Sequence, residues 1–303
     1  MNVMVTGGAG FIGSHIVDLL IEKGYSVVII DDLSTGKMEN INKEAEFYKI
    51  GIQSDELYKI FQKKRITHII HQAAQVDVQS SLNNPLFDAD INICGTINLL
   101  ECCRKYGVKK IVYASSAAVY GEPEYLPIDE DHPVQPLSPY GISKYTPEHY
   151  ITMYHKIYGI EYTILRYSNV FGPRQSAEGE GGVISIFVDR MLADKRPVIY
   201  GDGSQSRDFI FVKDVAAANI KSLEKGNGRI MNISCCKKHT IHELVSYLNK
   251  ALDKKLNTEY RKERTGDIRH SLLDNNLAHN YLNWNPRYKF YEGLQETVNY
   301  YRI

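Results

Sequence analysis

The sequence predicts an α/β protein with a doubly wound parallel sheet, followed by a smaller α/β part. Three observations predict this fold. A glycine-rich turn joins a first strand to a first helix, two acidic residues follow the second strand, and strands alternate with helices through the first half of the 303 residues. Such alternation is typical of βαβ units, in which helices cover both faces of a parallel sheet.

The glycine-rich turn lies within the first fifteen residues. An apolar run at residues 3–5 leads into TGGAGFIG, and apolar residues at helical spacing follow. Glycines at these positions permit a tight turn, close approach of a pyrophosphate and close packing of helix on strand. The free N–H groups and the positive end of the helix dipole then face the phosphates. This context predicts a Rossmann-type dinucleotide site.

The second strand, at residues 25–30, ends in Asp31 and Asp32. A carboxylate about 20 residues beyond the glycines is where a ribose 2′-hydroxyl is bound. Because two carboxylates would repel a 2′-phosphate, we expect NAD rather than NADP. Ser34, Thr35 and Gly36 follow and are expected to contact the adenosine ribose or the phosphates. The alternative is that Asp31 only caps the chain after the strand.

Composition excludes several classes of protein. Hydrophobic residues make up 43% and charged residues 24% of the chain, and the formal net charge is zero, so no basic stripe predicts nucleic-acid or membrane binding. A strand begins near residue 2, and no apolar run approaches the roughly 18–20 residues that span a bilayer. We expect a cytoplasmic protein. The cysteine spacing fits neither a disulfide framework nor a zinc site, so we expect reduced thiols and no metal.

Further strands are predicted at residues 66–70, 110–115 and 162–166, and a long helix at 88–106. Ligands bind beyond the carboxyl ends of the strands in such sheets. The segments to inspect are therefore those that follow each strand.

Tyr140 and Lys144 open the next predicted helix and share one face of it at i, i+4 spacing. A tyrosine with an ordinary pKa near 10 is a poor base at neutral pH. A neighbouring ammonium and an oxidised nicotinamide would stabilise its phenolate. Ser116, at the end of a strand, could bind the same substrate oxygen. A surface pair of Tyr and Lys is the alternative, and Pro147 predicts a kink nearby.

Several motifs together resemble the extended short-chain dehydrogenase/reductases, and within them the UDP-glucose (UDP-galactose) 4-epimerases. They are TGGAGFIGSH, DDLSTG, HQAAQVDV, NICGTINLLE, ASSAAVYGE, YGISK, LRYSNVFGPRQ, GEGGVISIF, YGDGSQSRDFIFVKDV and RTGDIRHS. The resemblance implies that Tyr140 is the base, that Lys144 binds the nicotinamide ribose, and that Ser116 assists proton transfer at the sugar O4. It implies an NAD site that includes Gly7, Gly10, Phe11, Ile12, Gly13, Asp31, Asp32, Ile52, Ala73, Ala74, Gln75, Asn92, Ser115 and Tyr167.

The chain departs from the resembling enzymes near the adenine. Those enzymes usually carry an aspartate after the third strand, where this chain has Ile52 followed by Gln53. Unless Gln53 substitutes, the adenine amino group lacks a carboxylate partner.

A second part begins near Asn169, where the regular pattern loosens. Arg207 and Arg264 lie in no periodic polar face, and separate arginines that converge on a diphosphate would explain them. Taken alone, each could equally be a solvated or structural arginine. The resemblance implies a UDP-sugar site formed by Ser116, Asn169, Val183, Tyr200, Arg207, Arg264, Asp267 and Ser271, with Arg269 as a further candidate.

We expect residues 1–168 to form the NAD-binding domain, with a return segment at about 207–225. Residues 169–206 and 226–303 should form the UDP-sugar-binding lobe. Within this division the strand 230–234 and the helix 241–252 are assigned to the second lobe, and residues 209–212 and the helix 215–224 to the first. The resemblance also implies a homodimer that packs helices at 88–106 and 138–158.

The residues after Ser116 bear on the reaction. Related dehydratases place Asp-Glu where this chain has Ala117 and Ala118, and an alanine cannot transfer a proton. What remains is inversion at C4 of a UDP-hexose through a 4-keto sugar, with NAD as cofactor. Ser271, four residues after Asp267, is small where a large tyrosine would restrict the site, so UDP-GlcNAc and UDP-GalNAc should also be accepted. The alternatives are a UDP-glucuronate 4-epimerase and a non-catalytic nucleotide-sensing regulator.

Overall fold

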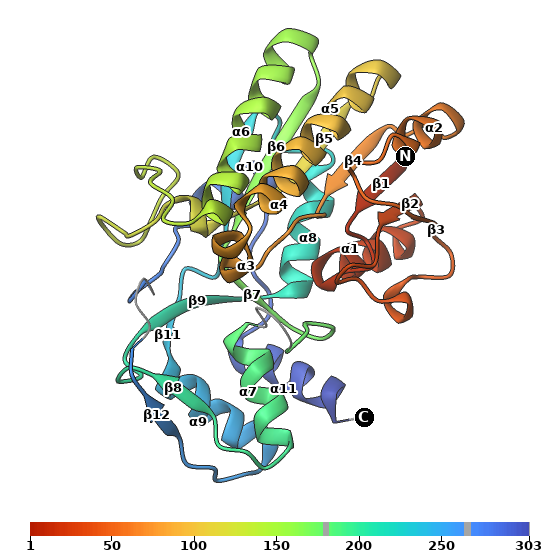
Figure 1. The fold of residues 1–303 in the computed structure, drawn as a ribbon. Helices are drawn as coiled ribbons and strands as arrows, with labels where there is room; N and C mark the ends of the chain where they lie inside the picture. Colours follow the sequence, from red (N-terminus) through yellow and green to blue (C-terminus); the bar gives the residue numbers. More distant parts are fainter. Residues whose placement is uncertain (178–181, 264–267, 303) are drawn as a thin grey trace.

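A computed structural model describes residues 1–177, 182–263 and 268–302. It shows a large part, built around a seven-stranded sheet, and a small part that contains two short sheets (Figure 1). The N-terminus lies in the large part and the C-terminus in the small part. Arg264 and Asp267, two predicted substrate residues, lie outside the described residues.

The seven strands of the large sheet are all parallel, in the order β10-β6-β5-β4-β1-β2-β3. Their apolar sequences suit strands that are covered on both faces. The order reverses at β1, which lies between β2 and β4, and this is the switch point where doubly wound sheets bind ligands. The predicted fold class is confirmed. The bounds are β1 (Asn2–Thr6), β2 (Ser26–Asp31), β3 (Glu46–Lys49), β4 (His68–His71), β5 (Lys110–Ser116), β6 (Glu161–Tyr167) and β10 (Arg229–Ile233).

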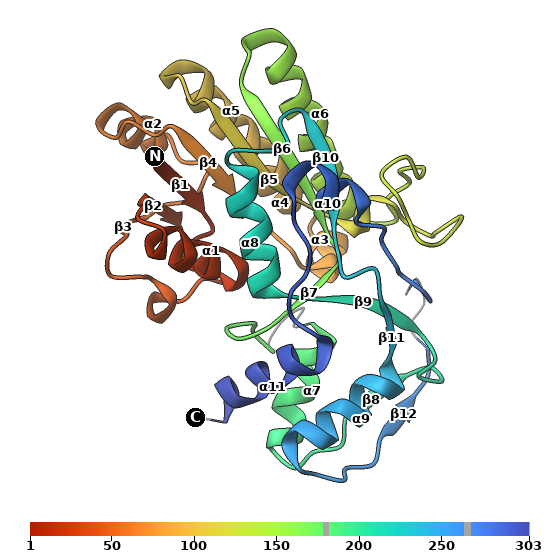
Figure 2. The same cartoon turned by 180° about the vertical axis from the view of Figure 1, so that it is seen from behind.

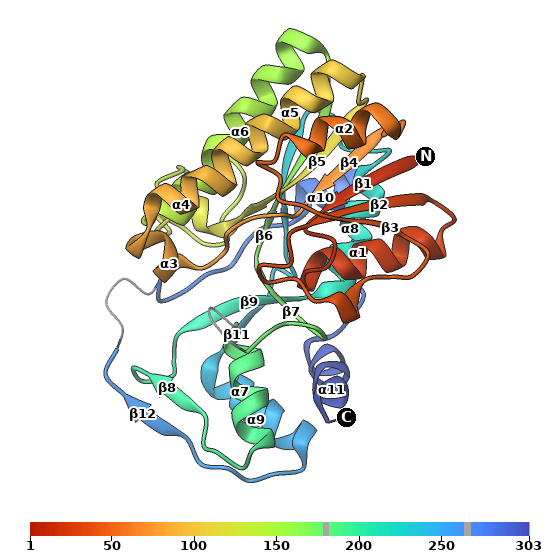
Figure 3. The ribbon, with the colours of Figure 1, turned by 45° about the vertical axis from the view of Figure 1, so that its right-hand side comes forward.

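Helices cover both faces of this sheet (Figure 3). One face packs against α2 (Glu56–Lys63), α5 (Gly95–Tyr106) and α6 (Pro139–Tyr158), and the other against α1 (Phe11–Glu22), α8 (Val212–Ser222) and α10 (Asn276–Leu282). Successive side chains of a strand point to opposite faces. Val3 and Val5 therefore enter the core beneath α1 and α8, whereas Met4 enters the core beneath α2 and α5.

The long helix predicted at residues 88–106 is interrupted. The chain forms α3 (Val78–Asn83), α4 (Pro85–Ala89), a π-helical turn η2 (Asp90–Cys94) and then α5. π-helical turns are rare and occur frequently at functional sites, and the predicted cofactor residue Asn92 lies in the middle of this one. Helix α6, in contrast, is continuous through Pro147. Two short 3₁₀ helices, η1 (Met38–Asn40) and η3 (Ala117–Val119), follow β2 and β5.

The small part contains a three-stranded sheet in the order β11-β9-β7 and the pair β12-β8. Helices α7, α9 and α11 pack against them around an aromatic core that includes Phe171, Phe209 and Phe290. Figure 2 shows β9 at the boundary between this part and α8. The bounds are β7 (Asn169–Phe171), β8 (Val198–Tyr200), β9 (Ser206–Phe211), β11 (Lys238–Thr240), β12 (Glu259–Arg261), α7 (Val183–Leu192), α9 (Ile241–Leu252) and α11 (Phe290–Tyr301).

Two segment assignments were wrong. The strand at 230–234 was assigned to the second lobe, but β10 pairs with β6 in the large sheet, with Ile230 opposite Ile164. Residues 209–211 were assigned to the first lobe, but β9 pairs with β7 and β11. Short apolar strands fit either sheet, and only the tertiary pairing distinguishes them. Helix α8 does pack against α1, and α9 lies in the small part, as expected.

Across the described residues, no helix is long and apolar enough to cross a membrane.

Candidate active site

The glycine turn opens at the carboxyl end of β1. Gly7 has a positive φ of 68°, and a Cβ there would lie 2.7 Å from the backbone nitrogen of Ala73. A Cβ on Gly13 would lie 2.0 Å from the Gly7 carbonyl oxygen, so the first turn of α1 packs directly on the glycine turn. A side chain at Gly7 would push the turn away from the segment after β4, and one at Gly13 would push α1 away from the turn. Gly10, Phe11 and Ile12, between them, begin the helix.

Asp31 ends β2 and is buried beside this turn. Its Oδ2 accepts a hydrogen bond from the Ala9 N–H at 2.9 Å, and its Oδ1 accepts one from the Leu33 N–H at 2.9 Å. Burial raises the pKa of this carboxyl group, although the backbone donors oppose the shift. Asp31 thus caps the chain, as the alternative interpretation proposed. Each carboxylate oxygen can accept a second hydrogen bond. The cap is therefore compatible with the predicted contact between Asp31 and a ribose.

The loop after Asp31 folds back over it. The Asp32 Oδ1 accepts a hydrogen bond from the Ser34 N–H at 2.8 Å. A Cβ on Gly36 would lie 2.6 Å from the Asp31 Oδ1. The segment Ser34, Thr35 and Gly36 is therefore beside the glycine turn, where an adenosine ribose would lie.

Ile52 does not face this loop. It is 3% exposed and belongs to the core beneath α2 and α5, and a Cβ on Gly95 would lie 2.7 Å from its Cδ1. Asn98 holds the Ile52 carbonyl oxygen through its Nδ2 at 2.8 Å. Ile52 can offer an adenine only an apolar wall, while the neighbouring Gln53 is exposed.

A buried hydrogen-bond chain that no sequence pattern indicates connects β1 to the π-helical turn. His71 lies between Thr6 Oγ1, at 2.7 Å from Nδ1, and Thr96 Oγ1, at 2.9 Å from Nε2. Thr96 donates to the Asn92 carbonyl oxygen at 2.6 Å. Burial lowers the pKa of His71 to about 3, so the imidazole is neutral at pH 7 and serves as a structural link.

Gln75 and Asn92, both predicted to contact the cofactor, lie side by side. The Gln75 N–H donates to Asn92 Oδ1 at 2.8 Å, and Asn92 Nδ2 donates to the Gln75 carbonyl oxygen at 2.9 Å. Asn92 Nδ2 also reaches the hydroxyl of Ser143, on α6, at 2.9 Å. Ala73 and Ala74 lie just before Gln75 and after β4. The pair thus joins the segment after β4 to the helix that carries Tyr140 and Lys144.

Lys144 is buried, and its Nζ lies 5.1 Å from the ring centre of Tyr113. Burial lowers its pKa to about 8, while the carboxylates of Asp88 and Glu148 oppose the shift. Within the described residues, Lys144 takes part in no ion pair. A buried ammonium without a carboxylate partner fits the binding of ligand hydroxyls, and with the glycine turn and Asp31 it makes the site suitable for NAD.

Ser116 and Tyr140 come to the same edge of the sheet from β5 and α6. Ser116 is opposite Tyr167 in the strand register, and its Oγ accepts a hydrogen bond from the Ala118 N–H at 3.1 Å. A Cβ on Gly141 would lie 2.7 Å from the Ala118 carbonyl oxygen. The first turn of α6, which carries Tyr140, therefore packs directly against the segment that follows Ser116.

A buried ion pair that no sequence motif predicts lies beneath these residues. Arg166 Nε and Nη2 donate to the Glu148 carboxylate at 3.0 and 2.6 Å, and the Ser115 hydroxyl donates to Glu148 Oε1 at 2.5 Å. Glu148 is on α6, one turn beyond Lys144. Arg166 directly precedes Tyr167, whose hydroxyl bonds Gln72 and Asn219. Contact of Ser115 or Tyr167 with the cofactor stays a prediction.

The predicted substrate residues fall into two groups. Asn169 is opposite Phe209 in β9, and Arg207 lies in the same strand and donates from Nη1 to the Ser206 and Arg269 carbonyl oxygens. Ser271 is also beside β9, since its N–H donates to the Ser206 carbonyl oxygen at 3.1 Å. The other two lie elsewhere in the small part: Tyr200 in β8, paired with β12, and Val183 at the start of α7. Arg269 pairs with Asp202 at 2.9 Å.

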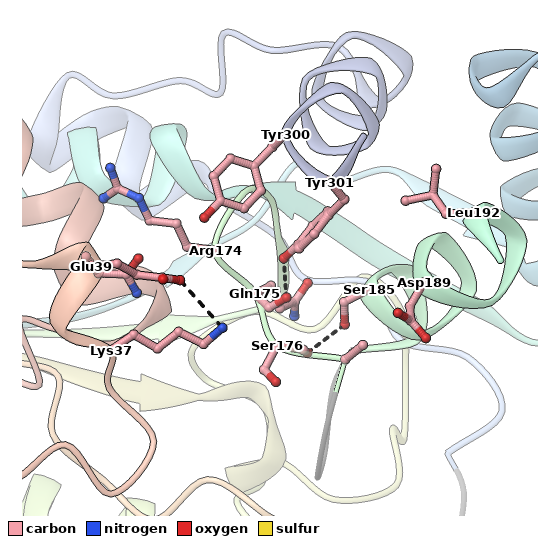
Figure 4. A pocket seen from close by; sticks show the side chains of 12 residues that line it. Lys37, Glu39, Arg174, Gln175, Ser176, Ser185, Asp189, Leu192, Tyr300 and Tyr301 are labelled. Atoms are coloured by element: carbon pink, nitrogen blue, oxygen red, sulfur yellow. Dashed lines mark hydrogen bonds and ion pairs between the residues drawn. The ribbon is translucent and has the colours of Figure 1, made fainter. Parts of the chain in front are cut away.

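A pocket of about 270 Å³ lies between the loop after β2, the loop after β7, α7 and α11 (Figure 4). On one wall of the pocket, Lys37 and Glu39 form an ion pair at 3.7 Å. On another wall, the Tyr301 hydroxyl donates a hydrogen bond to the Gln175 carbonyl oxygen. None of the predicted catalytic residues lines it. It borders the loop expected at the adenosine ribose but is separate from the site of the chemistry.

Comparison with known proteins identifies the family of this chain. The sequence profile of the NAD dependent epimerase/dehydratase family matches residues 3–234. A putative UDP-glucose 4-epimerase of Methanocaldococcus jannaschii is 50% identical over 299 residues, which cover 98% of this chain and 97% of that protein.

Two solved structures are also similar over almost the whole chain. The UDP-glucose 4-epimerase of Thermotoga maritima, solved with UDP-glucose, has a TM-score of 0.98 and 44% identity, with 100% and 99% of the two chains covered. The UDP-N-acetylglucosamine 4-epimerase of Methanobrevibacter ruminantium, in complex with UDP-N-acetylmuramic acid, has a TM-score of 0.95 and 42% identity, with 99% and 98% covered. Because the family profile matches most of the chain and the relatives are similar over nearly all of it, the chain belongs to the NAD-dependent epimerase/dehydratase family.

Proposed function

We propose that the protein is a UDP-hexose 4-epimerase that interconverts UDP-glucose and UDP-galactose, and also UDP-GlcNAc and UDP-GalNAc. The observation that carries the proposal is the packing of the first turn of α6, at Gly141 beside Tyr140, against the segment after Ser116, which contains Ala117 and Ala118 in place of acidic residues. The M. jannaschii relative bears the name putative UDP-glucose 4-epimerase, and the similar T. maritima structure is that of a UDP-glucose 4-epimerase.

The cofactor is NAD, which when bound removes and returns the C4 hydrogen of the sugar. The glycine turn and the N-terminus of α1 would hold its pyrophosphate, Asp31 the adenosine ribose and Lys144 the nicotinamide ribose. We propose that the large part holds this cofactor and that the small part, which includes Arg207 of β9, holds the UDP-sugar together with Arg264 and Asp267. The approximate boundary is residue 168, with later segments returning to each part.

The side chains would perform the proton chemistry. Tyr140, as its phenolate, takes the proton from the sugar O4 and later returns it, because it opens α6 next to the segment that follows Ser116. Lys144, one turn on, stabilises the phenolate through its ammonium charge. Ser116 hydrogen-bonds O4 and orients it toward Tyr140. Ala117 and Ala118 offer no acid or base for C5, so elimination of water does not compete.

A coupled epimerase assay without added NAD tests the proposal, with UDP-glucose, UDP-GlcNAc and UDP-glucuronate in parallel. Turnover of the first two supports it. Turnover of UDP-glucuronate alone would favour the UDP-glucuronate 4-epimerase alternative. No turnover of any substrate, even with NAD added, would favour the non-catalytic nucleotide-sensing regulator. In the same assay deuterium at C4 should stay on the sugar, and its washout to solvent would contradict the mechanism.

Ser271→Tyr should abolish most activity toward UDP-GlcNAc while activity toward UDP-glucose remains. The added ring would occupy the space that an N-acetyl group needs beside β9, and overpacking of about 1–3 kcal/mol corresponds to roughly a 5- to 150-fold loss. The kcat/KM ratio of the two substrates measures the effect, with Ser271→Ala as the matched control. Full N-acetyl activity in the tyrosine variant would show that Ser271 does not gate the site.

We further propose a homodimer, because large apolar side chains are exposed on α4 and α6. Leu86 is 82% and Ile157 61% exposed, and Phe87, Ile142 and Met153 are exposed on the same helices. The two helices contact each other, and exposed apolar side chains that lie on neighbouring elements are typical of protein interfaces. Ile157→Glu should shift sedimentation toward the monomer, whereas Met38→Glu, at an exposed position on η1, should leave it unchanged. A wild-type protein that sediments as a monomer would refute the dimer.

A further inference from the structure

We propose that Ser81 is a positioning residue of the active site: its buried hydroxyl holds the backbone N–H of Tyr140 and so fixes the place from which α6 presents the catalytic tyrosine. The inference deepens the proposed epimerase function and rests on it. Ser81 lies between the motifs HQAAQVDV and NICGTINLLE, and neither of them assigns it a role.

Serine side chains hold the first turn of α6. The first N–H groups of an α-helix have no partner inside the helix. Pro139 contributes no N–H, and the Gly141 N–H donates to Oγ of Ser138, the N-cap of the same helix, at 3.1 Å. The Tyr140 N–H between them donates instead to Ser81 Oγ at 3.1 Å. The start of α6 at Tyr140 therefore depends on a side chain from another element.

The surroundings of Ser81 orient its hydroxyl oxygen as an acceptor. Ser81 is buried on α3, and its hydroxyl donates to the Val78 carbonyl oxygen at 2.7 Å. Because a serine hydroxyl has a single proton, its oxygen can only accept from Tyr140. Helix α3 is in turn tied to the predicted cofactor segment, since Gln75 Nε2 donates to the carbonyl oxygen of Asp77, the N-cap of α3, at 2.9 Å. Ser81 thus connects the segment after β4 to the start of α6.

The carbonyl oxygen of Tyr140 is held as well. It accepts a hydrogen bond from Ser143 Oγ at 3.0 Å, and Ser143 Oγ accepts one from Asn92 Nδ2 at 2.9 Å. Side chains linked to α3 and to the π-helical turn therefore bind both polar backbone groups of Tyr140. A displacement of about 1 Å can lower the rate of an enzyme by about 10²-fold. Because the tyrosine ring moves with its backbone, loss of the contact with Ser81 should displace the phenolate oxygen from the sugar O4.

Ser81→Ala removes the acceptor but does not weaken α3, because alanine is the better helix former. We expect kcat to fall by about 10- to 50-fold, while the KM for the UDP-sugar and the retention of NAD change little. Ser80→Ala is the matched control, because Ser80 is the exposed neighbour on the same helix, and its kcat should stay within about twofold of wild type. A wild-type kcat in Ser81→Ala would overturn the inference. If Ser81→Ala does not fold, Ser81→Cys, whose sulfur is a weak acceptor, takes its place.

Hydrogen exchange at the Tyr140 amide tests the contact itself, by NMR on the purified holoenzyme labelled with ¹⁵N-tyrosine. The Tyr140 signal is identified by its loss in Tyr140→Phe. Exchange at Tyr140 should be at least about tenfold faster in Ser81→Ala than in wild type, whereas exchange at Tyr150, on the same helix, should be unchanged. No acceleration at Tyr140, or equal acceleration at both amides, would refute a positioning role. A wild type without epimerase activity would contradict the proposed function, while the exchange would still decide whether Ser81 holds the Tyr140 backbone.

Discussion

Tyr140→Phe should lower kcat by about 10²- to 10⁴-fold, the usual contribution of a positioned acid–base group. The variant removes a single hydroxyl at the start of α6, where the first turn packs against the segment after Ser116. Because the phenyl ring keeps its volume, retention of NAD and the affinity for UDP should be unchanged. Pre-steady-state measurement of the reduced cofactor, with UDP-glucose as substrate, separates loss of chemistry from loss of binding.

Tyr150→Phe is the control for this experiment. Tyr150 lies on the same helix and packs at the margin of the core beneath α2 and α5, away from the edge that carries Ser116. Removal of the Tyr150 hydroxyl should change the activation free energy by only a few tenths of a kcal/mol, as is usual for a substitution outside a functional site. The kcat should then stay within about twofold of wild type. Equal activity of Tyr140→Phe and wild type would remove Tyr140 from the mechanism.

Glu148→Gln should lower the free energy of unfolding by about 3–5 kcal/mol, because it leaves the Arg166 guanidinium buried without a countercharge. The two side chains are 2% and 4% exposed, and the pair also binds the Ser115 hydroxyl. Urea unfolding followed by circular dichroism measures the loss.

The double variant Glu148→Met/Arg166→Met should recover most of that stability, because apolar pairs of similar volume commonly replace buried ion pairs at little cost. Glu39→Gln, which breaks the exposed pair with Lys37, should change the unfolding free energy by less than about 1 kcal/mol. If the double variant is as unstable as Glu148→Gln, the pair contributes more to the free energy of unfolding than the neutralisation of two buried charges.

The sequence predicted those features that local pattern determines. The glycine turn, the carboxylate at the end of β2 and the pairing of Tyr140 with Lys144 on one helical face each depend on residues close together in the chain. The parallel sheet followed from the alternation of apolar strands with helical patterns, and the strand ends then indicated where Ser116 and Gln75 would lie.

The features that the sequence did not predict depend on partners distant in the chain. Nothing near residue 230 distinguishes a seventh strand beside β6 from a strand of the small part. The π-helical turn at Asp90–Cys94 has an ordinary helical composition, and it forms where Asn92 must reach both Gln75 and Ser143. Glu148 and Arg166 are separated by a helix end and a strand, so their pairing appears only after both have packed against β5. The assigned roles of Arg264 and Asp267 stay predictions.

The path of the chain between the two parts determines how the molecule should unfold. The polypeptide leaves the large sheet after β6, returns at α8 and β10, leaves again for β11 and α9, and returns once more at α10 before it ends in α11. A fragment that stops near residue 168 would lack β10, α8 and α10, and would expose the apolar face that those helices cover. The two parts should therefore melt in a single calorimetric transition, and a protease cut in one connection should not release either part as an independently folded piece.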